Sequence, residues 1–420
     1  MPNALMTETA VSLLGIDAVR LGTPADAIEG VVPRVIVEPA SADAVGRVLE
    51  WASREKHCVL VRGSGTKIGW GAAPRQVDIL ISTGRLNAVV AHRHGDLTAT
   101  IQAGAKLGDV NRALALHRQW IPLDPPSADR ATIGGIVATN DSGPRRHRYG
   151  APRDLIIGAE FARADGQLAK GGGIVVKNVA GYDLPRLLTG SFGSLAVIVT
   201  ATFKLYPLTA ASRTLVVEPS TPSDLGALAV KLSASHLTPT ALEFATHPLR
   251  LIVRFESIEA SVAQQSETAS RLIAEHGCQA RMLSESEEEA FWQNHARLAD
   301  DDGGALLKVS VLPTELADTL SVIERLAGKR GYVAAGRAGA GVFLLRIGDE
   351  VQLQKRVIDG LRDALQIGRG SAVVVKSSPE LRMHVDVWGP IGDGLALTKA
   401  VKQQFDPSGI LSPGRGPGGL

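Results

Sequence analysis

The chain has 420 residues, of which 45% are hydrophobic and 21% charged, and its formal net charge is +2. A chain of this length usually divides into more than one domain, so we expect two. The near-balanced charge gives no indication of a nucleic-acid-binding surface, and no apolar run reaches the ~18 residues that span a bilayer. Only two cysteines are present, too few for an iron–sulfur cluster or a cysteine-rich zinc site.

Periodicity in the first half predicts a β-α-β unit followed by more strands. Ser41 is expected to cap a helix that ends near Lys56, with Val45 and Leu49 on its buried face. A second helix is expected from Leu107 to about Gln119. Strands are expected at residues 34–39, 57–61, 78–83, 87–91, 97–104, 155–171 (a hairpin turning at Asp165-Gly166) and 194–205.

The segment VRGSGTKIGWG, residues 61–71, contains four glycines at the end of an expected strand. It fits neither the G-x-G-x-x-G dinucleotide fingerprint, because Gly69 comes one residue late, nor the Walker loop, because Ile68 follows Lys67. Taken alone, the segment is equally consistent with an ordinary tight turn and with a cradle for an anion.

A second cluster of small residues lies in a long aperiodic segment, residues 122–143, which we expect to be a functional loop. This segment contains TIGG (132–135) and TNDSG (139–143), and RYG (148–150) follows it. Exposed N–H groups and short hydroxyl or amide side chains can surround a pyrophosphate without a metal ion. Two such clusters in one domain favour the anion cradle.

The second half contains a weak repeat of the order β-α-β-β-α. One copy begins at Thr214 and the other at Ala305. This arrangement predicts an α+β domain on a mixed or mostly antiparallel sheet. A last helix, LALTKAVKQQF, and a Pro/Gly-rich tail end the chain.

Four motifs in this order resemble the vanillyl-alcohol-oxidase, or PCMH-type, FAD-binding superfamily, and within it the FAD-binding (E) subunit of bacterial glycolate oxidase. They are VRGSGTKIG, the segment from DPPSADR to DLIIG, VVKNVAGYDLPRLLTGSFGSLAVI and the terminal FDPSGILSPGR. The resemblance implies an α+β PCMH-type FAD-binding domain of two subdomains with an α+β cap domain. We therefore expect an N-terminal extension (1–29), the FAD-binding domain (30–207), the cap (208–385) and a C-terminal segment that returns to the FAD-binding domain (386–420).

The resemblance also implies which residues bind FAD. The first glycine loop would wrap the pyrophosphate, the region 126–143 would line the path from adenosine to flavin, and Ile198 would meet the cofactor through its backbone. The expected residues are Arg62, Gly63, Ser64, Gly65, Thr66, Lys67, Pro126, Ser127, Thr132, Gly134, Gly135, Thr139, Asn140, Ser142, Gly143, Tyr149, Gly150 and Ile198.

Departures from the superfamily's patterns qualify this expectation. Relatives with covalent flavin carry a histidine in the first glycine loop, which this chain lacks, so FAD is expected to bind non-covalently. The H-x-G-D-G-N-x-H metal-and-substrate motif is reduced to Gly392-Asp393-Gly394, so no metal site is expected. In the tail, Ser412 replaces the usual asparagine.

Catalytic residues are not established by the sequence. Lys177 and Tyr182 are candidates because the superfamily keeps their segment near the flavin ring, and His384 is the one histidine near arginines that could hold a carboxylate, among them Arg254, Arg337, Arg346 and Arg382. The residues Glu285 to Glu289 are interpreted as the solvated start of a helix.

Two functions remain open, together with a scaffold that has lost its cofactor. The first is the flavin subunit of a 2-hydroxy-acid (glycolate) dehydrogenase, with a sister flavin subunit and an iron–sulfur subunit leading electrons to quinone. The second is a self-sufficient FAD oxidase that uses its own cap. We expect a cytoplasmic location, with attachment to the inner face of the cytoplasmic membrane only through partners.

Overall fold

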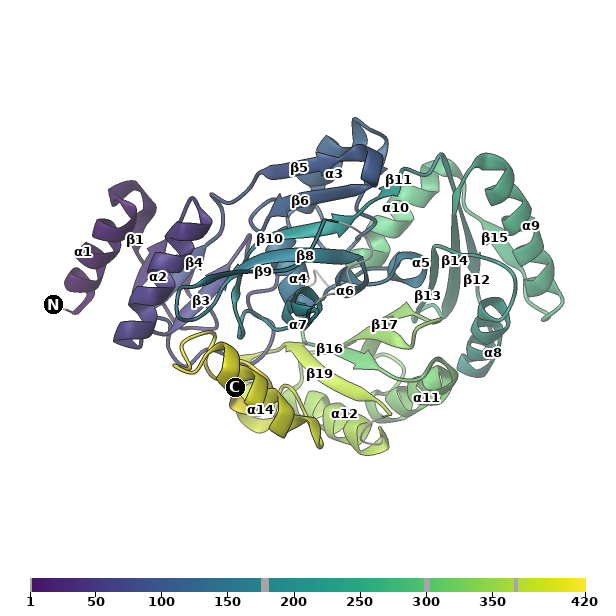
Figure 1. Ribbon diagram of the computed structural model, residues 1–420. Coiled ribbons are helices and arrows are strands. Elements are labelled where there is room, and N and C mark those ends of the chain that lie inside the picture. The colour runs from purple at the N-terminus through teal and green to yellow at the C-terminus, as the bar shows by residue number, and fades with distance from the viewer. Residues whose placement is uncertain (1, 175–180, 298–302, 366–368) are drawn as a thin grey trace. The chain divides into compact units, whose positions relative to one another are not determined.

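The computed structural model describes residues 2–174, 181–297, 303–365 and 369–420. The described chain forms two compact units (Figure 1). The first unit comprises the chain up to residue 141, residues 151–208 and residues 393–420, and the second comprises residues 142–150 and 209–392. Residues 142–150 therefore make their contacts with the second unit, whereas the sequence analysis assigned them to the FAD-binding domain.

The first sheet of the first unit contains the expected β-α-β arrangement. Its strand order is β1-β2-β4-β3, in which β2, β4 and β3 run parallel and β1 runs antiparallel to β2. Ser41 caps the helix α2 as predicted, because its side chain accepts a hydrogen bond from the N–H of Ala44 at 3.2 Å. The bounds are α1 (Pro2–Leu14), β1 (Val19–Leu21), β2 (Val35–Val37), α2 (Ala42–Glu55), β3 (Val59–Arg62) and β4 (Ile79–Ser82).

The second sheet of the first unit is antiparallel, with the order β5-β6-β10-β8-β9. Leu114 and Ile136, from the helices α3 and α4, share a buried core with Ile101 and Phe203 of the sheet. The bounds are β5 (Val89–Arg93), β6 (Thr98–Gln102), α3 (Leu107–Ala115), β7 (Gln119–Trp120), α4 (Ile133–Thr139), α6 (Pro152–Leu155), β8 (Ile156–Ala162), β9 (Leu168–Gly172), α7 (Leu184–Leu188), β10 (Val197–Lys204) and β11 (Tyr206–Pro207).

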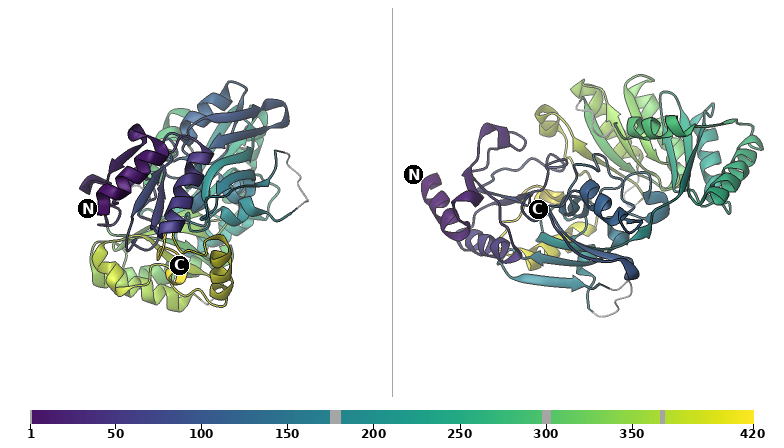
Figure 2. Two further views of the ribbon diagram at one scale, coloured as in Figure 1. Left: turned by 60° about the vertical axis from the view of Figure 1, so that its left-hand side comes forward. Right: turned by 90° about the horizontal axis from the view of Figure 1, so that it is seen from above.

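The second unit is built on one eight-stranded antiparallel sheet with the order β15-β12-β14-β13-β17-β18-β16-β19. The two halves of this order mirror each other about the β13–β17 pair, which accounts for the repeat in the sequence. Helices α8, α9, α11 and α12 lie on one face of the sheet (Figure 2). The bounds are α5 (Arg146–Tyr149), β12 (Ala211–Val217), α8 (Pro222–Ser233), β13 (Ala241–Ala245), β14 (Arg250–Ser257), α9 (Glu259–Ala274), β15 (Ala280–Met282), α10 (Glu285–Ala296), β16 (Ala305–Ser310), α11 (Leu316–Ala327), β17 (Tyr332–Arg337), β18 (Val342–Ile347), α12 (Val351–Ala364), β19 (Ser371–Lys376) and α13 (Pro379–His384).

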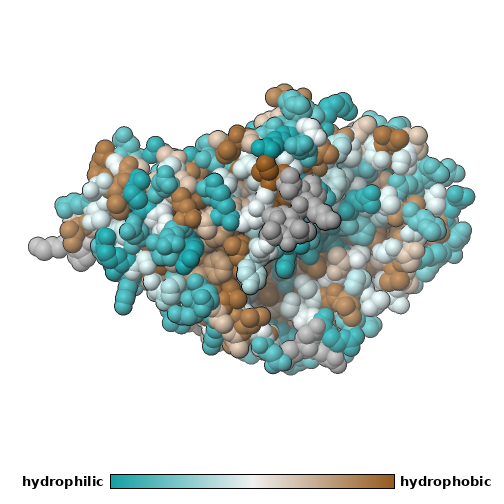
Figure 3. Space-filling model, in the orientation of Figure 1, coloured by the Kyte–Doolittle hydropathy of each residue, from teal (hydrophilic) through white to brown (hydrophobic). Residues whose placement is uncertain are grey.

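The last segment of the chain returns to the first unit. After α14 (Gly394–Phe405), Leu411 forms a parallel bridge with Val59, so the tail extends the sheet beside β3. Among the described residues, none of the helices has the length and apolar content needed to cross a bilayer. Hydrophilic and hydrophobic residues are interspersed on the face drawn in Figure 3.

Candidate functional site

The first glycine loop leaves β3 at Arg62 and presents main-chain donors. Among the described residues, the N–H groups of Ser64, Gly65, Thr66 and Lys67 donate to no protein acceptor. Gly65 has a φ of +79°, a conformation that side chains with a Cβ rarely adopt. A run of main-chain N–H groups that meet no acceptor in the protein is suited to bind an anion.

The second glycine cluster lies directly against this loop. A Cβ on Gly63 would stand 2.0 Å from the hydroxyl oxygen of Thr132, so only glycine permits the two segments to approach this closely. Gly134 packs on Ala103, whose carbonyl accepts the Gly134 N–H at 2.7 Å. The sequence predicted no regular structure here, but residues 133–139 form the short helix α4.

The two clusters line one cavity, which is partly open to solvent. One part of its wall is polar and is formed by the two glycine clusters, and the other part is apolar and includes Phe192, Ala196 and Val197. A cofactor with a phosphate portion and a ring portion requires this combination. All the residues of the wall belong to the first unit.

Two cationic side chains at this cavity, Lys67 and Arg62, are paired with carboxylates. Nζ of Lys67 lies 3.1 Å from Oδ2 of Asp141, with both side chains 7% exposed. Arg62 contacts Asp26 at 3.4 Å. The hydrogen bonds that Arg20 donates to Asp26 outweigh the effect of burial and hold the pKa of that carboxyl well below its usual range.

Most residues expected to bind FAD are brought together by this cavity. Its wall includes Arg62, Gly63, Ser64, Gly65, Thr66, Lys67, Thr132, Gly134, Gly135, Thr139 and Ile198. It does not include Pro126, Ser127 and Asn140, although the Pro126 carbonyl accepts a hydrogen bond from Lys67 at 3.3 Å. Ser142, Gly143, Tyr149 and Gly150 belong to the second unit, where Arg337 donates hydrogen bonds to the carbonyls of Ser142 and Gly143.

The catalytic candidates that the structure describes, Tyr182 and His384, do not belong to the cavity wall. Lys177 falls outside the described residues. The Tyr182 side chain is 91% exposed. His384 is the last residue of α13 and is exposed in the second unit.

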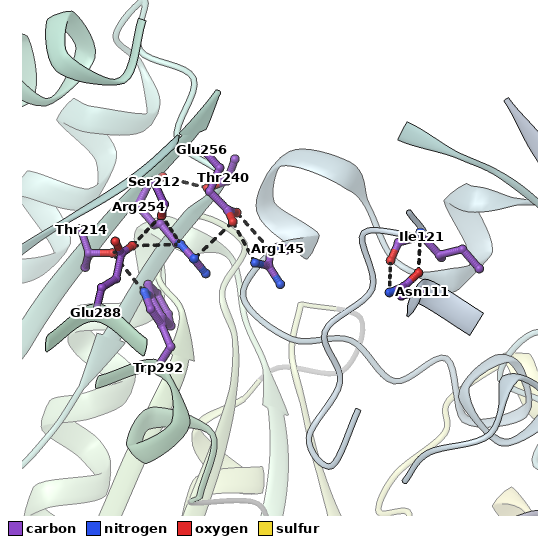
Figure 4. Close-up of polar contacts among 10 residues, drawn as sticks. All are labelled: Asn111, Ile121, Arg145, Ser212, Thr214, Thr240, Arg254, Glu256, Glu288 and Trp292. Carbon is purple, nitrogen blue, oxygen red and sulfur yellow. Dashed lines mark hydrogen bonds and ion pairs between the residues drawn. The ribbon is translucent and has the colours of Figure 1, made fainter. Parts of the chain in front are cut away.

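Sequence reasoning missed a buried ionic network in the second unit (Figure 4). Two hydrogen bonds of 3.0 and 2.8 Å join Arg145 to the carboxylate of Glu256, and Arg254 bridges Glu256 and Glu288 at 3.2 Å each. The interpretation of Glu288 as solvated was wrong, because its side chain accepts hydrogen bonds from Ser212 and Thr214 and is buried. The side-chain partners of Glu288 named here, Ser212, Thr214 and Arg254, are all distant in sequence.

A further buried carboxylate in the same unit is Glu243. Its Oε2 lies 3.1 Å from Nε2 of His295, and its Oε1 lies 3.9 Å from Nε of Arg337. Burial lowers the pKa of the nearby His147 despite the favourable charge of Glu243. The pair formed by Glu243 and His295, a carboxylate beside an imidazole, has the composition of an acid–base group.

Two hydrogen bonds hold the chain at the start of the aperiodic segment, residues 122–143. The side-chain amide of Asn111 in α3 donates to the Ile121 carbonyl at 3.1 Å and accepts from the Ile121 N–H at 2.9 Å (Figure 4). These two bonds fix the chain where the segment 122–143 begins. Its far end carries Asp141, the partner of Lys67.

Comparison with known proteins identifies the kind of site this is. The FAD binding domain family matches residues 33–172, and the C-terminal domain of FAD linked oxidases matches residues 389–415. Residues 33–172 therefore resemble the FAD binding domain family, and residues 389–415 resemble the C-terminal domain of FAD linked oxidases. FAD is the cofactor of this family, and the glycine-lined cavity with its acceptor-free N–H groups fits it. Arg62 to Lys67, Thr132 and Gly135 would hold the cofactor, which supplies the redox chemistry when bound.

Individual relatives extend along different lengths of the chain. Glycolate oxidase subunit GlcD of Bacillus subtilis (strain 168) is 27% identical over 91% of this chain and 89% of its own. Glycolate oxidase subunit GlcE of Escherichia coli (strain K12) is 34% identical over 39% of this chain and 47% of its own. The crystal structure of p-cresol methylhydroxylase superposes with a TM-score of 0.77 at 16% identity, over 98% of this chain and 96% of that one. The expected α+β fold with an FAD-binding domain and a cap is confirmed.

Proposed function

We propose that this FAD-linked oxidoreductase is the flavin-binding subunit of a glycolate, or more generally 2-hydroxy-acid, dehydrogenase complex. The chain's similarity to two glycolate oxidase subunits supports the substrate class. The observation that carries the proposal is the cavity in which the two glycine clusters meet, because it combines acceptor-free N–H groups with an apolar wall within one unit.

The motif and the cysteines that this sequence lacks support the proposal that other subunits carry out substrate oxidation and hold the iron–sulfur cluster. The sequence lacks the complete H-x-G-D-G-N-x-H motif: Leu395 follows Gly392-Asp393-Gly394. Among the described residues, no group of three or more His, Cys, Asp and Glu side chains is arranged to hold a metal ion. With Cys58 and Cys278 as its only cysteines, this chain cannot supply the four thiolates that usually hold an iron–sulfur cluster.

The proposed partners follow from these gaps. A sister flavin subunit would carry the oxidation of the 2-hydroxy acid, and an iron–sulfur subunit would pass electrons towards quinone. In this proposal the complex is cytoplasmic and reaches the membrane only through a partner. This chain's own residues bind the flavin, orient it and shield it from water.

Purification of the native complex tests the proposal. Mild isolation through a tag on this chain should recover two further polypeptides, about one FAD per flavin subunit, and iron in the fraction that contains the cysteine-rich partner. Recovery of this chain alone, with FAD and with full 2-hydroxy-acid dehydrogenase activity, would overturn the proposal.

The self-sufficient oxidase is the second candidate, and the second unit gives a specific reason to keep it. Glu243 and His295 form a buried carboxylate–imidazole pair in a unit that also contains several arginines. Oxidation of a hydroxy acid needs a base for the hydroxyl proton and cations for the carboxylate. Substitution of His295 by glutamine would abolish turnover by the isolated chain in this case.

A further inference from the structure

The C-terminal tail carries one side chain, Arg415, that contacts the segment 63–72, which contains the first glycine loop and is called the cofactor loop here. Arg415 is 7% exposed, and its guanidinium donates to three loop carbonyls: Ile68 at 2.6 Å, Trp70 at 2.6 Å and Ala72 at 3.0 Å. The N–H of Ala72 donates in return to the Arg415 carbonyl at 3.3 Å. Arg415 also forms part of the cavity wall.

These contacts matter because the loop has few internal restraints. Within residues 63–71, main-chain hydrogen bonds among the described residues join Ile68 to Gly65 and Trp70 to Lys67. A glycine-rich segment gains much conformational entropy when it is released. Three charge-assisted hydrogen bonds from one planar group restrict this freedom, since a guanidinium presents its donors in a fixed geometry.

The direction of the carbonyls is also significant. In a trans peptide the C=O and the following N–H point in opposite directions. A guanidinium that gathers the carbonyls of Ile68, Trp70 and Ala72 keeps those acceptors turned towards itself. Carbonyl oxygens turned towards a phosphate would instead repel it.

The tail that carries Arg415 is itself firmly attached. The N–H of Val59 donates to the Ile410 carbonyl at 2.8 Å, and the N–H of Ser412 donates to the Val59 carbonyl at 2.9 Å. Buried Lys402 donates to the Leu411 carbonyl at 2.8 Å and to Asp406 at 2.6 Å. The guanidinium is therefore held from the same strand, β3, that leads into the cofactor loop.

We infer that Arg415 is a positioning residue for the cofactor: it fixes the shape of residues 63–72 so that the N–H groups of Ser64 to Lys67 are preorganised for the cofactor's phosphates. This inference rests on the proposed binding of FAD in the cavity. It assigns a function to the C-terminal segment in addition to extending the sheet beside β3. Preorganisation of this kind raises affinity because less entropy is lost on binding.

Two variants and a matched control test it. Arg415→Gln removes the charge and most of the donors, while Arg415→Lys keeps the charge but cannot span three carbonyls. Arg163→Lys is the control, because Arg163 pairs with Asp165 on the surface of the same unit, with 38% of its side chain exposed. FAD dissociation constants come from titration of the apoprotein, and amide hydrogen exchange of residues 63–72 is followed by mass spectrometry.

We expect FAD affinity to fall about 10- to 100-fold in Arg415→Gln and about tenfold in Arg415→Lys, with faster exchange confined to the loop. Arg163→Lys should match the wild type. Wild-type affinity and exchange in Arg415→Lys would overturn the positioning role, because the charge alone would then suffice. If Arg415→Gln does not fold, Arg415→Lys decides the question. Failure of the wild-type chain to bind FAD would instead reject the proposed function.

Discussion

Lys67 and Asp141 form a buried ion pair at the wall of the cofactor cavity, with Nζ and Oδ2 3.1 Å apart. A buried cation whose partner is removed is destabilising, by about 3–5 kcal/mol in typical cases. In Asp141→Asn, an anionic cofactor in the cavity would compensate for the lost carboxylate. We therefore expect this variant to be less stable than the wild type without FAD and to gain more than the wild type when FAD is added, as measured by thermal unfolding.

The control for this prediction is another buried aspartate with a cationic partner in the same unit. Asp78 lies 3.1 Å from Arg34, and neither residue belongs to the cavity wall. Asp78→Asn should destabilise the apoprotein and the FAD-loaded protein equally. An equal FAD-induced gain in both variants would contradict a cofactor contact by Lys67.

The glycines of the cavity should differ in their response to substitution. Gly65→Val forces a β-branched residue to a φ of +79°, and Gly135→Val adds a side chain at a wall position where the nearest atom to a new Cβ is the Thr132 hydroxyl, at 3.2 Å. We expect both variants to fold and to lose FAD binding. Gly15→Val is the control, because Gly15 has a φ of +88° with no atom near a new Cβ and lies outside the cavity wall. Retained flavin in both cavity variants would mean that the cofactor binds elsewhere.

The flavin should be released by denaturation. The sequence has no histidine or cysteine between residues 61 and 71 or between residues 122 and 143, so neither glycine cluster offers a usual covalent attachment. Acid or heat should free all of the flavin as FAD, measured by absorbance and chromatography of the supernatant. Flavin that stays with the precipitated polypeptide would show a covalent bond.

The second unit should lose stability in acid because of Glu256. Burial opposes its ionisation, but the hydrogen bonds and charge of Arg145, together with the charge of Arg254, keep the pKa of Glu256 below its usual value. The unfolded chain therefore takes up this proton at a higher pH than the folded one, so stability falls as the pH drops below about 4.5. Urea unfolding from about pH 5 to about pH 3 should give a shallower loss in Glu256→Gln, which is about 3 kcal/mol or more less stable at neutral pH. An unchanged slope in the variant would assign the acid sensitivity to other groups.

Local patterns predicted those parts of the fold that local interactions determine. Ser41 and the apolar spacing of Val45 and Leu49 are sufficient to specify α2, and short apolar runs rich in β-branched residues indicated most strands. The helix α4 was missed because it is short and contains Gly134 and Gly135, which are poor helix formers; tertiary packing of Ile133 and Ile136 stabilises it.

The site was predictable where glycine patterns mark it, and not where distant segments complete it. Arg415 reaches a loop more than three hundred residues earlier in the chain, and Glu288 reaches Ser212 and Thr214 on β12. Neither residue belongs to a periodic pattern that indicates its partner. The ionic network around Arg254 was likewise invisible, because its four charges come from three separate segments.

Turnover by the isolated chain tests the division of labour most directly. The purified, FAD-loaded subunit is mixed with glycolate or D-lactate and an artificial dye acceptor, first alone and then with the two partner subunits. The account predicts negligible dye reduction by the isolated chain and activity on reconstitution. Robust turnover by the isolated chain that is lost in His384→Ala or His295→Gln would contradict it, and the self-sufficient oxidase would then be the correct reading.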